Sequence, residues 1–265
     1  MNDKYNEFVS CLEEIKACNK TQLVSNCYFD NNILKRLFDE DNASFDYEKG
    51  AFLNLFVKHQ GFYRIYYFVV DFGRYSISHS DLLVCDIFTR DGSDKQDNIQ
   101  KKLLTNKFYE INTFHKWVIR NVNVSGNIID NLSYLEKIEK NIEDIIETTF
   151  DKYSHHLPSE KGGLSNYMRD HNVVIAYEND MMVGFLIYHI ERKVIVEDFW
   201  FVNPAMRGRG VASNIYMWLF RKFSDANYSF SAWVRDNNIE SIALRKKFGA
   251  VKTKEKQIVY LRYTK

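Results

Sequence analysis

The chain has 265 residues, of which 45% are hydrophobic and 27% charged, with 20 Phe and 17 Tyr. This composition is typical of a folded globular protein with a substantial core and excludes extended disorder. The net charge of +1, from 36 Lys and Arg against 35 Asp and Glu, lacks the basic excess that nucleic-acid-binding proteins carry, so we expect no nucleic acid partner.

The cysteines and histidines are few and scattered. Four cysteines (11, 18, 27 and 85) form no CxxC pair, which fits a reducing compartment. His155 and His156 form the only histidine cluster, without further ligands at metal-binding spacing, so we expect no metal. The N-terminus MNDKYNEFVS lacks the features of a secretory signal, and no apolar run could span a bilayer. We therefore expect a cytoplasmic protein without a membrane partner.

Hydrophobic periodicity predicts mixed helices and strands in the N-terminal half. We expect helices over 3–20, 32–39, 48–59 and 95–106, and strands over 63–71, 82–89 and 109–120. The segment 121–131 (NVNVSGNIIDN) is rich in Asn, Ser and Gly, which favours a domain boundary. We place a smaller N-terminal α+β domain at 1–125 and a second domain at 126–265.

The second domain alternates strands and helices more clearly. We expect helices over 132–149, 161–169, 211–223 and 239–248, and strands over 173–177, 182–190, 194–202, 230–234 and 251–263. The turn at 178–180 joins two of these strands as a hairpin, and Gly249 is suited to end the last helix. The order predicts an α/β fold with a mixed, mostly antiparallel sheet and helices on both faces.

A weak internal repeat links the two halves. NIQKKLLTNKF (98–108) and NIESIALRKKF (238–248) agree at five of eleven positions. Either this is chance similarity between two helices, or the N-terminal region is a degenerate copy of the C-terminal one. In the second case the copy has lost a piece, because its two strands lie too close together in sequence to hold a loop and a helix between them.

The segment DFWFVNPAMRGRGVASNIYMWLF (198–220) carries the clearest chemical signal. A strand ends at Val202, and a turn with Gly208 and Gly210 leads directly into a helix. The unpaired N–H groups and positive dipole at a helix N-terminus suit a phosphate, and Arg207 and Arg209 add cationic donors. No GxxxxGK[ST] motif is present, and GRGVAS completes the GxGxxG pattern poorly.

This segment resembles the pyrophosphate loop of the GNAT superfamily of N-acetyltransferases, R/Q-x-x-G-x-G/A, through Arg207, Gly210 and Ala212. The preceding V-x-P-x-x-R is also typical of that family and is present as Val202, Pro204 and Arg207. The hairpin VVIAYENDMMVGFLIY and the helix NIESIALRKKFG are similar to the neighbouring GNAT motifs. The resemblance covers roughly 132–265.

The resemblance implies a cofactor site for acetyl-CoA as co-substrate, with no metal. Its implied cofactor-binding residues are Phe201, Val202, Arg207, Gly208, Arg209, Gly210, Val211, Ala212, Ser213, Asn238 and Arg245. The family's strand splays from its neighbour beside Phe201 and Val202, where pantetheine pairs, and the Val202 N–H is the implied oxyanion donor. Asp198 is the implied general base. Its neighbour Glu197 is a second catalytic candidate, although strand alternation should point its side chain to the opposite face.

The sequence departs from the family at the general acid. Arg245 follows Leu244 where many relatives have Tyr, and a guanidinium does not readily donate a proton; Tyr216 and Tyr260 are the possible substitutes. The acceptor site in relatives involves the loop 151–163, where Tyr153, His155 and His156 are candidates. The resemblance implies transfer of an acetyl group to a primary amine of a small molecule or peptide, by a monomer or homodimer. A non-catalytic acyl-CoA sensor is the alternative.

Overall fold

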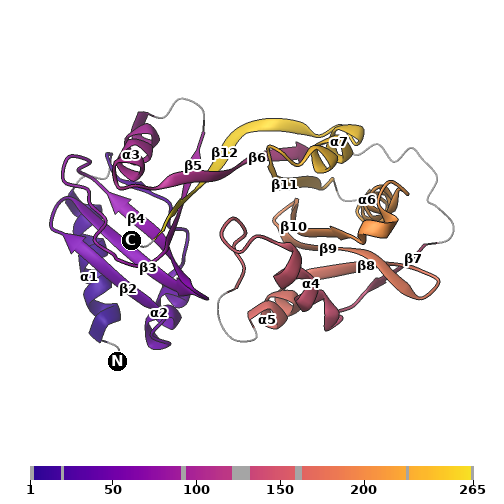
Figure 1. The fold of residues 1–265 in the computed structure, drawn as a ribbon, viewed down its shortest axis with the longest axis horizontal. Helices are drawn as coiled ribbons and strands as arrows, with labels where there is room; N and C mark the ends of the chain where they lie inside the picture. Colours follow the sequence, from indigo (N-terminus) through magenta and orange to yellow (C-terminus); the bar gives the residue numbers. More distant parts are fainter. Residues whose placement is uncertain are drawn as a thin grey trace. The chain divides into compact units, whose positions relative to one another are not determined.

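The computed structural model describes residues 3–18, 21–90, 94–120, 132–158, 163–224 and 227–263 (Figure 1). The chain forms two compact units, Met1–Thr113 together with Glu255–Lys265, and Phe114–Lys254. We call them the N-terminal unit and the C-terminal unit. No helix among the described residues is long and apolar enough to cross a membrane.

The N-terminal unit is a sheet covered by helices on both faces. One face packs on α1 and α2 through Leu53, Leu55 and Phe68, and the other packs on α3 through Phe56 and Ile65. The strand order is β2-β3-β4-β5-β12, antiparallel except for the parallel pair β4/β5. Its elements are α1 (Asp3–Cys18), β1 (Val24–Ser25), α2 (Asn31–Asp39), β2 (Ala43–Glu48), β3 (Phe52–His59), β4 (Phe62–Val69), β5 (Leu83–Thr89), α3 (Asp94–Thr105) and the second half of β12 (Val251–Arg262).

The C-terminal unit repeats this arrangement. Its strand order is β6-β11-β10-β9-β8-β7, again antiparallel except for the parallel pair β10/β11. Helices α4 and α5 cover one face and α6 covers the other. Its elements are the second half of β6 (Tyr109–Ile119), β7 (Ser133–Glu136), α4 (Asn141–Thr149), α5 (Gly163–Asp170), β8 (Asn172–Glu178), β9 (Met181–Glu191), β10 (Val194–Val202), α6 (Val211–Lys222), β11 (Ser229–Arg235) and α7 (Ile239–Lys247).

The predicted fold class is confirmed, and the two units are a tandem pair. In each unit a run of antiparallel strand pairs leads to a parallel pair, followed by a helix: α3 follows β5 as α7 follows β11. The N-terminal copy lacks the loop and helix of the C-terminal one, since the described residues 70–82 between β4 and β5 contain no helix. The weak sequence repeat therefore marks a degenerate second copy.

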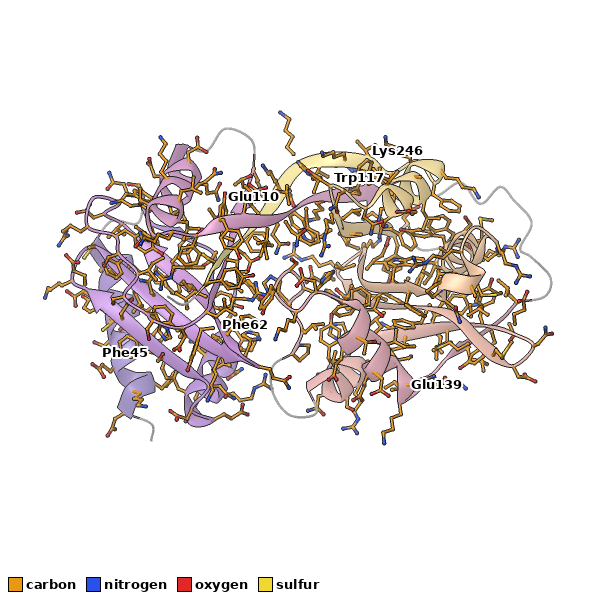
Figure 2. The ribbon with its side chains drawn as sticks, in the orientation of Figure 1. Phe45, Phe62, Glu110, Trp117, Glu139 and Lys246 are labelled. Carbon is orange, nitrogen blue, oxygen red and sulfur yellow. The ribbon has the colours of Figure 1, made fainter. Side chains whose placement is uncertain are left out.

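The boundaries between the two units follow Thr113 and Lys254, whereas the sequence predicted one boundary after residue 125. Strand β12 pairs with β5 in the N-terminal unit, whereas β6 pairs with β11 in the C-terminal unit. Strand β12, from the C-terminal end of the chain, thus completes the sheet of the N-terminal unit. Strand β6, from the N-terminal half of the chain, completes the sheet of the C-terminal unit. Within the C-terminal unit, Lys246 Nζ of α7 lies 5.9 Å from the centre of the Trp117 ring of β6 (Figure 2). The predicted boundary segment 121–131 lies outside the described residues.

Two predicted helices are wrong. The segment 48–59 forms the end of β2 and the strand β3, and 132–149 forms β7 and then α4. Residues Phe52 to Val57 are all buried, because both faces of β3 are covered by helices. A strand buried on both faces loses its alternating pattern and can imitate a helix in sequence.

Candidate active site

The glycine-rich turn after β10 adopts backbone angles that its glycines favour. Asn203 caps a short 3-10 turn over Pro204–Met206, its Oδ1 accepting the Ala205 N–H at 3.1 Å. Gly208 and Gly210 then have φ angles of +76° and +85°, in the left-handed region that side chains with a Cβ seldom adopt. The turn therefore depends on glycine at both positions to reach the start of α6.

The N-terminus of α6 presents open backbone donors. Gly210 is its N-cap residue and supplies no side-chain cap. The N–H groups of Val211, Ala212 and Ser213 belong to the first turn, where no intrahelical acceptor exists. With the positive end of the helix dipole, they form an anion site of the kind that holds phosphate groups.

Two cations lie beside this anion site. Arg207 and Lys247 both line the pocket described below, with Arg207 Nε 3.4 Å from the Val202 carbonyl oxygen and Lys247 Nζ 3.2 Å from Ser213 Oγ. Lys247 could not be predicted from the sequence, because the lysines near the end of α7 do not indicate which of them points toward α6. Arg209, by contrast, is not among the lining residues, and its guanidinium lies 3.5 Å from Glu178, so the structure does not place its side chain beside Arg207.

Strands β10 and β11 are no longer paired at Phe201 and Val202, the residues beside which the GNAT resemblance implied a separation. Their parallel pairing ends at Glu197 and Ala232. Beyond that point the Asn203 N–H donates to Val183 of β9, so, by strand alternation, the Val202 N–H points away from β9 and into the opening. Gly184 permits the tight pairing behind it, because a Cβ there would lie 2.8 Å from the Phe201 carbonyl oxygen.

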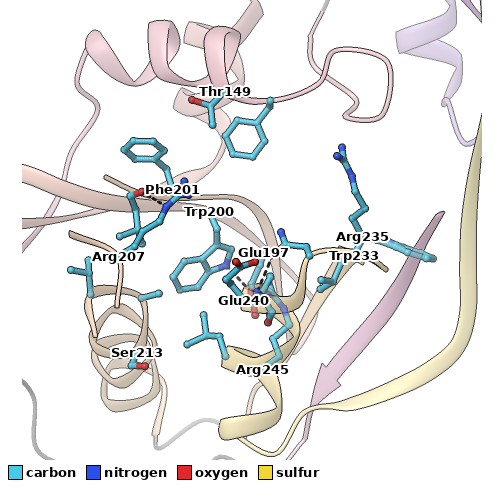
Figure 3. A pocket seen from close by; sticks show the side chains of 18 of the residues that line it. Thr149, Glu197, Trp200, Phe201, Arg207, Ser213, Trp233, Arg235, Glu240 and Arg245 are labelled. Atoms are coloured by element: carbon cyan, nitrogen blue, oxygen red, sulfur yellow. Dashed lines mark hydrogen bonds and ion pairs between the residues drawn. The ribbon is translucent and has the colours of Figure 1, made fainter. Parts of the chain in front are cut away.

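The space between the separated ends of β10 and β11 and the glycine-rich turn belong to one pocket of about 870 Å³ (Figure 3). Every implied cofactor-binding residue except Arg209 contributes to its wall. The rest of the lining comes mainly from β10, β11, α7 and the end of α4: Glu197, Asp198, Trp200, Thr149, Phe150, Asp151, Trp233, Val234, Arg235, Asn237, Glu240, Ser241, Leu244 and Lys247, with Phe114, His155 and Met206. Of the three acceptor-loop candidates, His155 lines the pocket and Tyr153 and His156 do not.

Glu197 is the centre of a buried polar cluster. Its carboxylate accepts hydrogen bonds from Trp200 Nε1 at 2.7 Å, from the Tyr216 hydroxyl at 2.7 and 2.8 Å, and from Arg245 Nη2 at 2.7 Å. A carboxylate saturated in this way is a poor base. The cluster therefore removes Glu197 from the catalytic candidates and explains Arg245, which neutralises a buried carboxylate.

Neither substitute acid fits its predicted role. Burial raises the pKa of Tyr216 well above its usual value, and its hydroxyl already donates to Glu197. Tyr260 belongs to the N-terminal unit and does not line the pocket. Asn238, whose position matches the family, caps α7 by accepting the Ser241 N–H at 3.0 Å.

Asp198 faces the opposite side of the sheet from Glu197, as predicted. The pairing of β10 with β9 shifts register between Glu197 and Phe199, so Asp198 occupies a β-bulge, which re-aims a side chain locally. Its Oδ2 lies 2.9 Å from His189 Nδ1, and this hydrogen bond raises the pKa of His189. Asp198 also lines the pocket.

The family was identified by comparison with known proteins. Residues 139–250 match the model of the Acetyltransferase (GNAT) family. This part of the chain is a GNAT-family domain. The match supports acyl-CoA-dependent acetyl transfer in general. No curated protein sequence matches the chain.

Solved structures extend the GNAT likeness to both units. The chain resembles a tandem GNAT protein from the clavulanic acid biosynthesis pathway (TM-score 0.60, 9% identity, 100% of this chain and 96% of that one). It also resembles GCN5-related N-acetyltransferases from Sphaerobacter thermophilus (0.59, 10%, 97% and 93%) and Kribbella flavida (0.53, 8%, 98% and 96%). At such identities the likeness concerns the fold.

Proposed function

We propose that this chain is an acetyl-CoA-dependent N-acetyltransferase that acetylates a primary amine of a small molecule or peptide within a ternary complex. The observation that carries the proposal is the pocket shared by the open N-terminus of α6 and the separation of β10 from β11. The helix N-terminus with Arg207 and Lys247 suits a pyrophosphate. The separated strand offers free backbone groups to an extended, amide-containing arm.

The GNAT domain would act mainly by positioning and electrostatics. The Val202 N–H, directed into the opening, would stabilise the oxyanion formed when the amine attacks the thioester carbonyl. Asp198 would take the proton from the amine as general base. The protein supplies no acid at Arg245, so coenzyme A would leave as the thiolate.

Calorimetric titration with acetyl-CoA tests the cofactor proposal directly, and we expect one site per chain. Thiol release with a panel of amines then tests turnover. Asp198→Asn should lower kcat by about 10²–10⁴-fold while leaving the acetyl-CoA affinity unchanged. Failure to bind any acyl-CoA would overturn the proposal as a whole, whereas unchanged turnover in Asp198→Asn would overturn only the assignment of the base.

The engagement of Arg245 by Glu197 favours one other candidate, a non-catalytic acyl-CoA sensor. In that case the pocket binds acetyl-CoA, but no amine in a broad panel provokes thiol release above the rate of hydrolysis. Binding together with amine-dependent release would exclude the sensor.

A further inference from the structure

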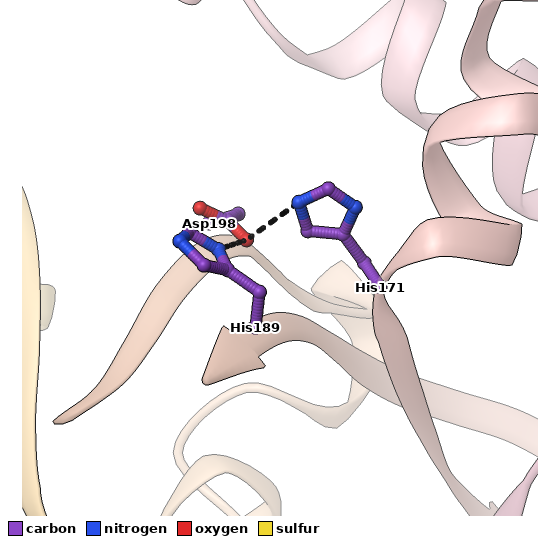
Figure 4. A group of neighbouring side chains, drawn as sticks. All are labelled: His171, His189 and Asp198. Atoms are coloured by element: carbon purple, nitrogen blue, oxygen red, sulfur yellow. Dashed lines mark hydrogen bonds and ion pairs between the residues drawn. The ribbon is translucent and has the colours of Figure 1, made fainter. Parts of the chain in front are cut away.

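Three side chains from separate elements meet on the face of the C-terminal sheet that α4 and α5 cover (Figure 4). His171 follows α5, His189 lies on β9, and Asp198 occupies the bulge of β10. Their side chains are 18%, 28% and 15% exposed. One nitrogen of each histidine and one carboxylate oxygen all lie within 4.8 Å of one another, so three donor atoms converge on one point.

Hydrogen bonds behind the cluster fix the orientation of both imidazoles. His171 Nδ1 lies 2.6 Å from the Tyr167 carbonyl oxygen, which can only accept, so Nδ1 carries a hydrogen and the lone pair of the neutral ring is on Nε2. That Nε2 faces Asp198 Oδ2 at 3.9 Å, too far for a hydrogen bond. On His189, Nδ1 faces Asp198 while Nε2 lies 3.3 Å from Glu191 Oε1.

This outer arrangement is the one that metal-binding histidines use. Their second ring nitrogen is held by a backbone carbonyl or a carboxylate, which orients the ring and makes the ligand more basic. Tyr167 supplies the carbonyl for His171, and Glu191 supplies the carboxylate for His189. The stacking of Tyr167 on His171, with ring centroids 3.7 Å apart, holds the imidazole further.

We propose that His171 Nε2, His189 Nδ1 and Asp198 Oδ2 bind a divalent transition metal ion, with Zn²⁺ as the best fit. Two imidazoles and one carboxylate suit such ions. Ligand atoms about 2.0–2.1 Å from a tetrahedral zinc lie roughly 3.3 Å apart, between the 2.9 and 3.9 Å that separate Asp198 Oδ2 from the two nitrogens. Small side-chain rotations would therefore complete the site, leaving a fourth position for water.

The sequence alone predicts no metal site, because His171, His189 and Asp198 do not have the short spacing of a metal-binding motif. The β8–β9 hairpin and the bulge of β10 bring these three side chains together. The spacing of the three residues along the sequence does not reveal that contact. His155 and His156, the conspicuous sequence pair, take no part.

Zinc titration of the chelator-treated full chain, in competition with a chromophoric chelator, tests the site. We expect one Zn²⁺ per chain, with an affinity at least tenfold lower in His171→Gln and in His189→Gln. His155→Gln is the matched control because it also removes a partly buried imidazole on this face, and it should bind as the unaltered chain does. Circular dichroism and thermal melting establish that each variant is folded.

Cobalt substitution identifies the ligands independently. We expect the visible bands of Co²⁺ held by nitrogen and oxygen, without the ultraviolet charge-transfer band of a thiolate. A thiolate band would assign the metal to a cysteine such as the exposed Cys18 and would overturn the proposal. So would the absence of stoichiometric binding, or binding that His171→Gln leaves unchanged, since the trio would then be a hydrogen-bonded cluster alone.

One consequence rests on the proposed function. If Asp198 is the general base, bound Zn²⁺ occupies it, and acetyl transfer should be inhibited with the same half-saturation as direct binding. Binding without inhibition would count against Asp198 as the base and leave the metal site standing. Failure to bind acetyl-CoA would leave the zinc titration unaffected.

Discussion

Arg245 and Glu197 form a buried ion pair with 2.7 Å between Nη2 and Oε2, and their side chains are only 5% and 2% exposed. The pair joins α7 to β10 at the wall of the cofactor pocket. Arg245 stands where many GNAT relatives have Tyr, so the departure from the family pattern is matched by a buried carboxylate that requires a cation.

Removing the cation alone should be costly. We expect Arg245→Met to lower the free energy of unfolding by about 3–5 kcal/mol, because it leaves the Glu197 charge buried without its cation. The double variant Glu197→Gln, Arg245→Met should lose less than the sum of the two single variants. Denaturant titration of all four proteins measures the coupling, and strict additivity would show that the two residues do not act as a pair.

Gly208 offers a test with a built-in control. Gly208 and Gly249 both have φ of +76°, and a Cβ at either would meet no atom within 4 Å. Alanine at each should therefore cost a similar 1–2 kcal/mol or so of stability from backbone strain. Only Gly208→Ala should weaken acetyl-CoA binding in calorimetry, by roughly tenfold, because a methyl group there obstructs the approach of the phosphates. Equal effects on binding would remove the turn from the site.

Arg207 and Arg209 form a second matched pair. Arg207→Ala should lower acetyl-CoA affinity by about tenfold, since a charge-assisted contact to phosphate is lost. Arg209→Ala should change it less than twofold, because Arg209 lies outside the pocket wall and pairs with Glu178. Titrations at two salt concentrations should show a weaker salt dependence for Arg207→Ala alone. The reverse order of effects would contradict the placement of both side chains.

His155 should make stability fall at mildly acidic pH. Its ring packs against Phe114, Phe150 and Phe199, and burial lowers its pKa below the usual 6.5. The unfolded chain therefore takes up the proton first as pH falls through about 6.5, so stability that is fully present above that pH is lost below it. Denaturant midpoints between pH 8 and 5 should show a smaller decline in His155→Phe, and an equal decline in both proteins would exclude His155 as the cause.

Asn26 links strands β4 and β5 of the N-terminal unit through its side chain. In the N-terminal unit β1 pairs with β4, and Asn26 bonds the carbonyls of Ile65 and Asp86 and the Tyr67 N–H at 2.8–3.2 Å. Asn26 thus lies between β4 and β5 where their parallel pairing ends, at Ile65 and Cys85. Asn26→Ala should lower the free energy of unfolding by about 2–4 kcal/mol, since buried backbone groups lose their partners. Asn32→Ala, on the exposed face of α2, is the control and should leave the free energy of unfolding unchanged. An equally small effect of Asn26→Ala would show that the Asn26 hydrogen bonds do not stabilise the N-terminal unit.

Local physics let the sequence determine the cofactor side of the site. Two glycines after a strand and before an amphipathic helix permit a left-handed turn, and the first turn of that helix leaves its N–H donors without intrahelical acceptors, whatever surrounds them. Most strands and helices of the C-terminal unit followed from periodicity for the same reason. Where burial on both faces erased the period, as in β3, the prediction failed.

Only the tertiary structure determined which side chains and which strands contact one another. The pairing of Glu197 with Arg245, the diversion of Arg209 to Glu178, the meeting of His171, His189 and Asp198, and the exchange of β6 and β12 between units all join residues distant in sequence. Such contacts depend on strand register, on the bulge at Asp198 and on which strands pair with β5 and β11. Local propensity does not encode these choices, because each is settled by the free energy of the packed whole.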